Sequence, residues 1–173
     1  MITLVRHMET DWNIEARFTA QAFHIRLNST GITQAERMAD RLEKVPFWAV
    51  FCSDQIRAIE TAIIIASRHE DITKFVTDPR LREVNVGSLV GKHTSYADRA
   101  KFSTHHPRFN FRSIGGESRS EVIARQLAIM KDIGISEVNK EVLVVGHGSA
   151  LRVLLEDLEI SEILTRENFI CLP

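Results

Sequence analysis

Cysteine is scarce in this chain, which has only Cys52 and Cys171 among its 173 residues. The two cysteines are far apart and match no spacing typical of a metal site. The sequence leaves open whether these two cysteines form a disulfide, but so few cysteines are more typical of a protein in a reducing compartment. We therefore expect a reduced protein in the cytoplasm.

The chain also lacks an excess of charge and any long hydrophobic run. Lys and Arg together number 22 and Asp and Glu 23, for a net charge of -1. Bulk charge thus gives no support for binding to nucleic acid or to a membrane surface. No stretch reaches the roughly 18 apolar residues that a membrane span needs, and the first residues enter an apolar run without the segments of a signal peptide. We expect neither nucleic acid nor membrane as a partner.

Short apolar runs alternate with helical patterns, which predicts an α/β fold with a mainly parallel sheet. The length fits a single domain over residues 1–173 with a sizeable core. Strands are predicted at residues 2–5, 48–52, 74–77 and 142–145. Capping boxes predict helices over 33–44 and 118–132, Ser53 as an N-cap predicts one to residue 69, and another is predicted over 150–158.

Residues 84–117 show little periodicity and contain four of the eight glycines. A long irregular segment inside a compact domain is often a lid or a pocket wall. We therefore predict a small irregular cap over this range.

Three of the predicted strands end in groups that can bind an anion. Arg6 and His7 follow the first strand, Arg57 lies one turn into the helix after the second, and His147 and Gly148 follow the last. In open α/β sheets, ligands bind beyond the carboxyl ends of the strands. Arginine matches phosphate oxygens bidentately, helix N-termini add free N–H groups, and glycine lets the backbone approach a ligand closely. The pattern predicts a phosphoryl-binding site if these strands are parallel neighbours.

His7 and Glu83 are the candidate reactive groups of this site. A neutral imidazole nitrogen can attack phosphorus to form a covalent intermediate, and nearby arginines disfavour protonation of His7. Glu83 is the candidate acid for the leaving oxygen, because repulsion from a bound phosphate favours the protonated carboxyl. Together with the phosphoryl site, these residues predict an enzyme that breaks a phosphate ester.

Five segments that follow one another in the family's order make the chain resemble the histidine phosphatase superfamily, also called the phosphoglycerate mutase-like family. The segments are LVRHMETDWN (residues 4–13), CSDQIRAIETA (52–62), LRE (81–83, with Gly87 and Gly91 after it), GGES (115–118) and VVGHG (144–148). The resemblance implies a mainly parallel sheet with helices on both faces and a variable cap. It also implies hydrolysis without metal or dissociable cofactor.

The resemblance assigns a role to each matching residue. His7 would become phosphohistidine, and Glu83 would protonate the leaving group and then activate water. The phosphate pocket would be formed by Arg6, Arg57 and His147, with a hydrogen bond from Asn13.

The chain departs from the family pattern in three places. Met8 stands where glycine is usual, and we expect its side chain to pack aside. Residues 17–20, Arg-Phe-Thr-Ala, stand where many members have arginine followed by Gln-Gly. The family's last strand is expected beyond residue 173, so either the sheet is one strand shorter or the natural chain continues. An exposed sheet edge would favour a homodimer.

The function that these features predict is a phosphomonoesterase acting on a small phosphorylated metabolite. A phosphoglycerate mutase needs more pocket wall to exclude water, and the stretch after Glu83 has only about 30 residues. A protein phosphohistidine phosphatase also fits the pattern, and a protein of another class, a catalytically silent phospholigand-binding module, stays open.

Overall fold

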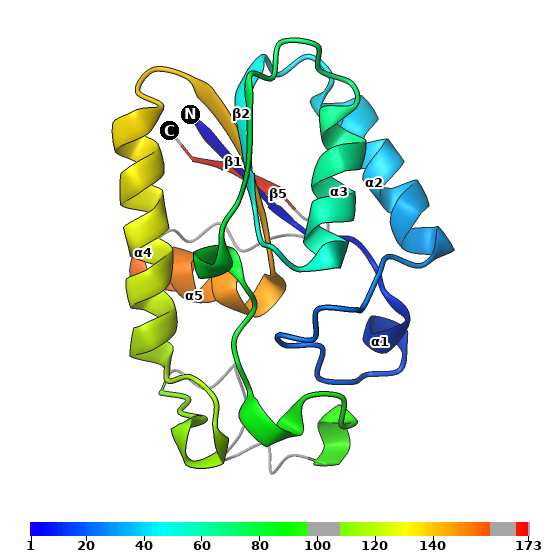
Figure 1. Ribbon diagram of the computed structural model, residues 1–173, viewed down its shortest axis with the longest axis vertical. Helices are drawn as coiled ribbons and strands as arrows, with labels where there is room; N and C mark the ends of the chain where they lie inside the picture. The colour runs from blue at the N-terminus through cyan, green and yellow to red at the C-terminus, as the bar shows by residue number, and fades with distance from the viewer. Residues whose placement is uncertain (97–107, 160–168, 173) are drawn as a thin grey trace.

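A computed structural model describes residues 1–96, 108–159 and 169–172 (Figure 1). Five strands form one sheet in the order β3-β2-β4-β1-β5. Their bounds are β1 Ile2–Arg6, β2 Phe47–Cys52, β3 Lys74–Thr77, β4 Glu141–Gly146 and β5 Phe169–Leu172. The first four are mutually parallel, and β5 runs antiparallel to β1. The predicted α/β class with a mainly parallel sheet is confirmed.

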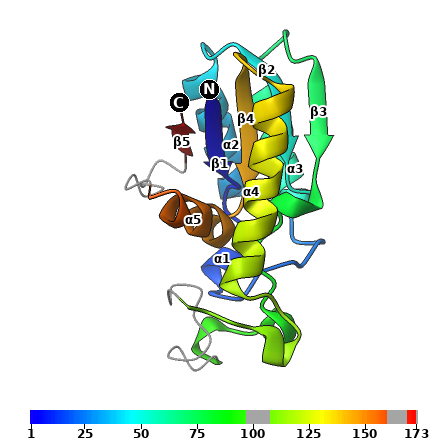
Figure 2. The ribbon, with the colours of Figure 1, turned by 90° about the vertical axis from the view of Figure 1, so that its left-hand side faces the viewer.

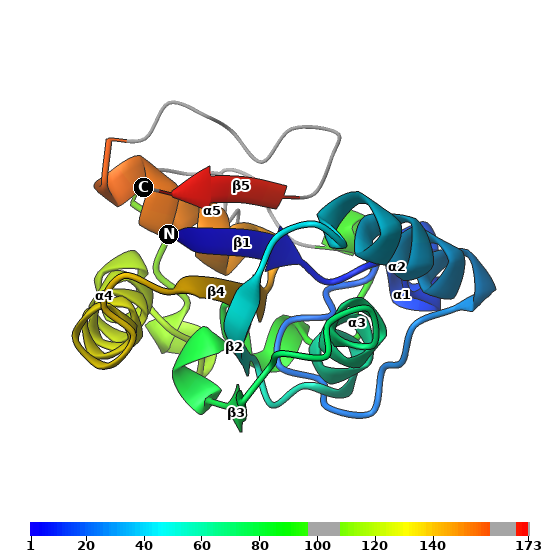
Figure 3. The same cartoon turned by 90° about the horizontal axis from the view of Figure 1, so that it is seen from above.

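Helices cover both faces of this sheet. Their bounds are α1 Asp11–Ile14, α2 Ser29–Leu42, α3 Ile56–Ala66, α4 Arg119–Ser136 and α5 Gly148–Asp157. Seen from above, α2 and α3 lie on one side of the strands and α4 and α5 on the other (Figure 3). The side-chain alternation of a strand produces this division. In β4, Leu143 and Val145 join the core under α2 and α3, while Val142 and Val144 join the core under α4 and α5.

The segments that carry functional residues gather beyond the carboxyl ends of the parallel strands. Turned by 90°, the molecule shows α1 and the loops on either side of the undescribed residues 97–107 below β1 and β4 (Figure 2). These loops contain the short 3₁₀ turns Pro79–Leu81, Gly87–Leu89, Thr94–Tyr96 and Arg112–Ile114. The described part of the predicted cap therefore lies over the edge where the site was expected.

The cap has its own small core, which fixes it to the sheet layer. Val84, Phe109 and Phe111 pack with Val122 of α4 and Val153 of α5. Gly87 permits the fold of this segment, because its φ is +57° and a Cβ there would lie 2.0 Å from the carbonyl oxygen of Ile114.

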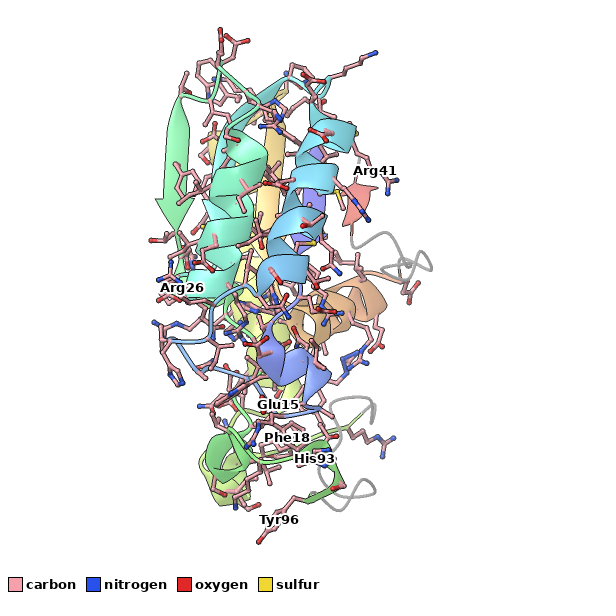
Figure 4. All side chains as sticks on the ribbon, turned by 90° about the vertical axis from the view of Figure 1, so that its right-hand side faces the viewer. Glu15, Phe18, Arg26, Arg41, His93 and Tyr96 are labelled. Atoms are coloured by element: carbon pink, nitrogen blue, oxygen red, sulfur yellow. The ribbon has the colours of Figure 1, made fainter. Side chains whose placement is uncertain are left out.

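A loop near the N-terminus closes against the cap. The N–H of Phe18 donates to the carbonyl of Lys92 at 2.9 Å, and Arg17 pairs with His93 in an isolated antiparallel bridge. Figure 4 shows the side chains of Phe18 and His93 at this lower end, with Tyr96 below them. The loop and the cap thus form one wall below the sheet.

Two helix starts differ from the sequence-based expectation. α2 begins at Ser29 rather than at residue 33, because the Asn28 side chain accepts from the N–H of Gly31 at 2.8 Å and caps it earlier. α3 begins at Ile56 after Gln55 rather than directly after Ser53, and it ends at Ala66. Ser53 Oγ instead accepts from the N–H of Gln55 at 3.3 Å in the turn before the helix.

The edge strand β5 was missed by the sequence analysis. It pairs with β1 over four positions, with Leu4 opposite Ile170. The expectation of a sheet one strand shorter is therefore wrong, since residues 169–172 already cover the edge of β1. Across the described ranges, no helix combines the length and apolarity needed to cross a membrane.

Candidate active site

The structure brings the predicted catalytic residues together at the carboxyl edge of the sheet. β1 and β4 are neighbours, and the N–H of His7 donates to the carbonyl of Gly146 at 2.9 Å. The rings of His7 and His147 lie 5.0 Å apart between centroids. Arg57 reaches both rings from α3, with Nε 3.3 Å from His7 Nε2 and Nη2 3.3 Å from His147 Nδ1. Residues separated by 140 positions thus share one site because their strands are parallel neighbours.

The tautomer of His7 is set by its own backbone neighbourhood. Its Nδ1 lies 2.7 Å from the carbonyl oxygen of Met8, which can only accept, so Nδ1 carries the proton. The lone pair is then on Nε2, on the side of Arg57. Burial, followed by the charges of Arg57 and Arg6, holds the pKa of His7 well below its usual value. At neutral pH the imidazole is uncharged and Nε2 can attack an electrophile.

His147 is also neutral, but it presents a donor. Burial lowers the pKa of His147 well below the usual value, with Arg57 as the next cause. Arg57 can only donate, so His147 Nδ1 accepts and its Nε2 carries the proton. Within the described residues this Nε2 is buried without a hydrogen-bond partner, and so is Nε of Arg6. Buried donors without partners are rare in folded proteins. Both therefore suit an anionic ligand.

Arg57 supplies a buried positive charge. Burial lowers the pKa of Arg57 to about 10, and the negative charge of Glu83 partly offsets that effect. The guanidinium is therefore still protonated at neutral pH. Two of its nitrogens donate to backbone carbonyls, Nη1 to Ala22 at 2.9 Å and Nη2 to Ala20 at 2.8 Å. These bonds aim Nε at His7.

Glu83 lies at the N-terminus of α5. One carboxylate oxygen accepts from the N–H of Ser149 at 3.1 Å, and the other accepts from Ala150 at 3.0 Å and from Val84 at 2.8 Å. Two of the free N–H groups of this helix, those of Ser149 and Ala150, thus bind Glu83.

Gly148 is where the backbone passes closest to Arg6. A Cβ on this glycine would lie 3.2 Å from Arg6 Nε and 3.3 Å from Arg6 Cδ. The glycine therefore permits the position of the Arg6 side chain, and its expected contact with a ligand stays a prediction.

Asn13 and Met8 have structural tasks that bear on their expected roles. The side-chain amide oxygen of Asn13 accepts from the N–H and the hydroxyl of Thr10, both at 3.0 Å, in the capping box of α1. Only its amide nitrogen can then donate to a phosphate. Met8 is 2% exposed and packs in the core with Ala35 and Met38, as expected of a side chain that packs aside.

Three supporting residues were missed by the sequence analysis. Thr61 accepts from the N–H of Met8 at 3.2 Å, Gln55 accepts from the N–H of Glu83 at 3.0 Å, and Arg125 donates to the Glu83 carbonyl at 3.1 Å. The spacing of Thr61 four residues after Arg57 was the available signal, because such residues share a helix face. No comparable signal marks Arg125, which comes from another layer.

Comparison with known proteins identifies the family. The model of the histidine phosphatase superfamily (branch 1) matches residues 2–170, and the chain belongs to this family. It is 33% identical to phosphoglycerate mutase-like protein 4 of Arabidopsis thaliana over 90% of this chain and 69% of that protein. It is 35% identical to a metal-independent phosphoserine phosphatase of the same plant, over 88% of this chain and 66% of that protein. The chain thus spans about two thirds of the length of these relatives.

Solved structures agree with this family. Bacillus stearothermophilus YhfR superposes with a TM-score of 0.81 at 29% identity, covering 91% of this chain and 79% of that one. The mycobacterial glucosyl-3-phosphoglycerate phosphatase Rv2419c, solved in complex with VO3, gives 0.80 at 27% identity, covering 96% and 85%. The predicted resemblance, the fold and the enzyme class, a phosphatase of the histidine phosphatase type, are confirmed.

Proposed function

We propose that this chain hydrolyses phosphate monoesters through a phosphohistidine on His7. The observation that carries the proposal is a pair of buried donors, Arg6 Nε and His147 Nε2, that have no hydrogen-bond partner in the described part of the chain and lie beside an uncharged His7. A phosphoryl group placed there would accept from both donors and meet the lone pair of His7 Nε2. The positive charges of Arg6 and Arg57 would neutralise its oxygens.

The chemistry would run in two steps with conserved atoms and charge. His7 Nε2 would form a bond to phosphorus while the ester P–O bond breaks, and Glu83 would give its proton to the leaving oxygen. Water would then attack phosphorus and lose a proton to Glu83. The N–P bond would break with its electron pair returning to His7, and inorganic phosphate would leave. The contact between Arg57 Nε and His7 Nε2 would be replaced by a contact with the phosphoryl group during each turnover.

The acceptor in this proposal is water, and the substrate is a small phosphorylated metabolite. Relatives named as a phosphoserine phosphatase and a glucosyl-3-phosphoglycerate phosphatase support hydrolysis. The arginines and neutral histidines already provide the charge and donors that the step requires, so we propose that no metal takes part. The cytoplasmic location and the homodimer stay predictions.

The experiment is turnover of p-nitrophenyl phosphate from pH 5 to 8 in the presence of a chelator. We expect hydrolysis by the wild type, none by His7→Ala, and an acid-labile, alkali-stable phosphoryl label on His7. His69→Ala is the control, because His69 follows the C-terminal end of α3 and packs against Phe47 of β2. A folded wild type without turnover would contradict the proposal and favour a silent binding module. Phosphoglycerate isomerisation primed with bisphosphoglycerate would instead identify a mutase.

A further inference from the structure

Gln55 is a fully buried polar residue at the N-terminus of α3. Its amide nitrogen donates to the carbonyls of Ala20 at 2.9 Å and Ala22 at 3.4 Å. Its amide oxygen accepts from the N–H of Glu83 at 3.0 Å. The single side chain therefore connects the N-terminal loop to the segment that carries the candidate acid.

The two carbonyls that Gln55 binds are the same two that hold Arg57. Arg57 donates to Ala20 and Ala22 through its terminal nitrogens. Ala20 has a φ of +39°, a conformation that costs a non-glycine residue roughly 1–3 kcal/mol and persists only when its surroundings enforce it. The hydrogen bonds from Gln55 and Arg57 to the Ala20 carbonyl hold the backbone in this conformation.

Glu83 is held on both sides of its backbone. Gln55 accepts from its N–H, while Gln21 and Arg125 donate to its carbonyl at 3.0 and 3.1 Å. The Gln55 bond connects the Glu83 backbone directly to the N-cap of the helix that carries Arg57. The ion pair of Arg82 with Asp54 joins the same two segments one residue earlier in each.

We propose that Gln55 is a positioning residue that sets the general acid Glu83 against the cradle formed by Arg57 and His7. The inference rests on the proposed function and deepens it. Gln55 would matter most for alkyl phosphates, whose leaving oxygen must be protonated as it departs. It would matter least for aryl phosphates with stable phenolate leaving groups. The site is thereby built for esters of aliphatic alcohols.

The test compares two substrates of similar shape, p-nitrophenyl phosphate and p-nitrobenzyl phosphate, in Gln55→Met. Methionine keeps the length of the side chain and removes both hydrogen-bonding functions. We measure kcat/KM, which reports steps up to departure of the leaving group. We expect kcat/KM for the benzyl ester to fall by roughly 10- to 100-fold more than for the phenyl ester, since a general acid contributes about 10²–10⁴-fold and small displacements remove much of it.

Gln126→Met is the matched control. Gln126 is also a fully buried glutamine, and its amide donates to the carbonyl of Arg80 at 3.1 Å, three residues before Glu83. It has no bond to Glu83 or to residues 20–22 among the hydrogen bonds of the described chain. We expect it to lower thermal stability, as Gln55→Met does, and to change kcat/KM for both esters by the same factor.

The outcomes separate this inference from the proposed function. Equal losses on both esters in Gln55→Met would overturn the positioning role and leave the phosphatase intact. A wild type active on the phenyl ester but not on the benzyl ester would also overturn it, because an effective acid is then absent. A wild type inactive on both would overturn the proposed function and the inference with it. If Gln55→Met does not fold, Gln55→Asn, whose amide is too short to reach both sides, must show the same selective loss.

Discussion

Replacing Gly148 by alanine tests how tightly the site positions Arg6. Gly148 is the first residue of α5, and an added Cβ would lie 3.2 Å from Arg6 Nε and 3.6 Å from Arg6 Cζ. The contact to Nε, and the one to Cδ at 3.3 Å, are shorter than ordinary van der Waals separations, whereas the contact to Cζ is an ordinary one. Arg6 must therefore shift by a few tenths of an ångström, in the direction away from α5.

The expected magnitude follows from the proposed role of Arg6. A displacement of about 1 Å can cost roughly 10²-fold in rate, so a shift of this size should cost about tenfold in kcat/KM, or ~1.4 kcal/mol of transition-state stabilisation. The free energy of unfolding should stay close to the wild-type value, because the advantage of roughly 0.5–1 kcal/mol that alanine has over glycine inside a helix is reduced at the first helical residue and is offset by the shift of Arg6. A loss of activity without a loss of stability is the signature.

The assay pairs kinetics on p-nitrophenyl phosphate with vanadate affinity and thermal unfolding. Gly134→Ala is the matched control, since Gly134 lies in α4 and nothing is within 4 Å of an added Cβ. It should raise stability and leave kcat/KM and vanadate binding unchanged. Wild-type kcat/KM and vanadate affinity in Gly148→Ala would refute the reasoning, because Arg6 would then tolerate displacement or play no part in phosphate binding.

Three further predictions concern titration, packing and thiol reactivity. Because the pKa values of His7 and His147 are lowered in the folded protein, these two histidines bind protons just below about pH 6.5 only when the chain is unfolded. Stability should therefore fall with decreasing pH below that value, by up to about 1.4 kcal/mol per pH unit for each histidine, and urea unfolding at pH 7 and 5 checks it; a pH-independent midpoint would contradict the assignment. Met8→Ala should cost about 2–5 kcal/mol, like Met38→Ala in the same core, with activity per folded molecule retained, and a selective loss of turnover in Met8→Ala would place its side chain in the site instead. Burial raises the pKa of Cys52 to about 12, so iodoacetamide at pH 8 should modify it only after unfolding, as mass spectrometry of the digested protein would show.

Local sequence features predicted most of the elements and the strand ends at which the candidate site residues lie. The capping box at Ser118 opens α4 as expected, with Glu121 as its partner. The apolar runs of β1 and β4 ended where Arg6, His7 and His147 begin, so the strand ends themselves marked the site. These predictions succeeded because periodicity and caps are properties of neighbouring residues.

The two failures have different causes. The start of α2 was missed although its signal is local, because Asn28 caps the helix at Ser29 by accepting from the N–H of Gly31. β5 is a short apolar run, and its pairing with β1 makes it a strand. Cross-strand pairing leaves little trace in a local window.

The sequence by itself determined that this chain has an Arg-His pair at a strand end, a second histidine between glycines and the family to which they belong. Only the tertiary structure decided how these groups are poised. The Met8 carbonyl sets which nitrogen of His7 carries the proton, the α5 amides bind Glu83, and Gln55 connects the Glu83 backbone to the Ala20 carbonyl that also binds Arg57. The physical reason is that protonation state and aim depend on burial and on hydrogen-bond partners. Those partners come from strands and loops far apart in the chain.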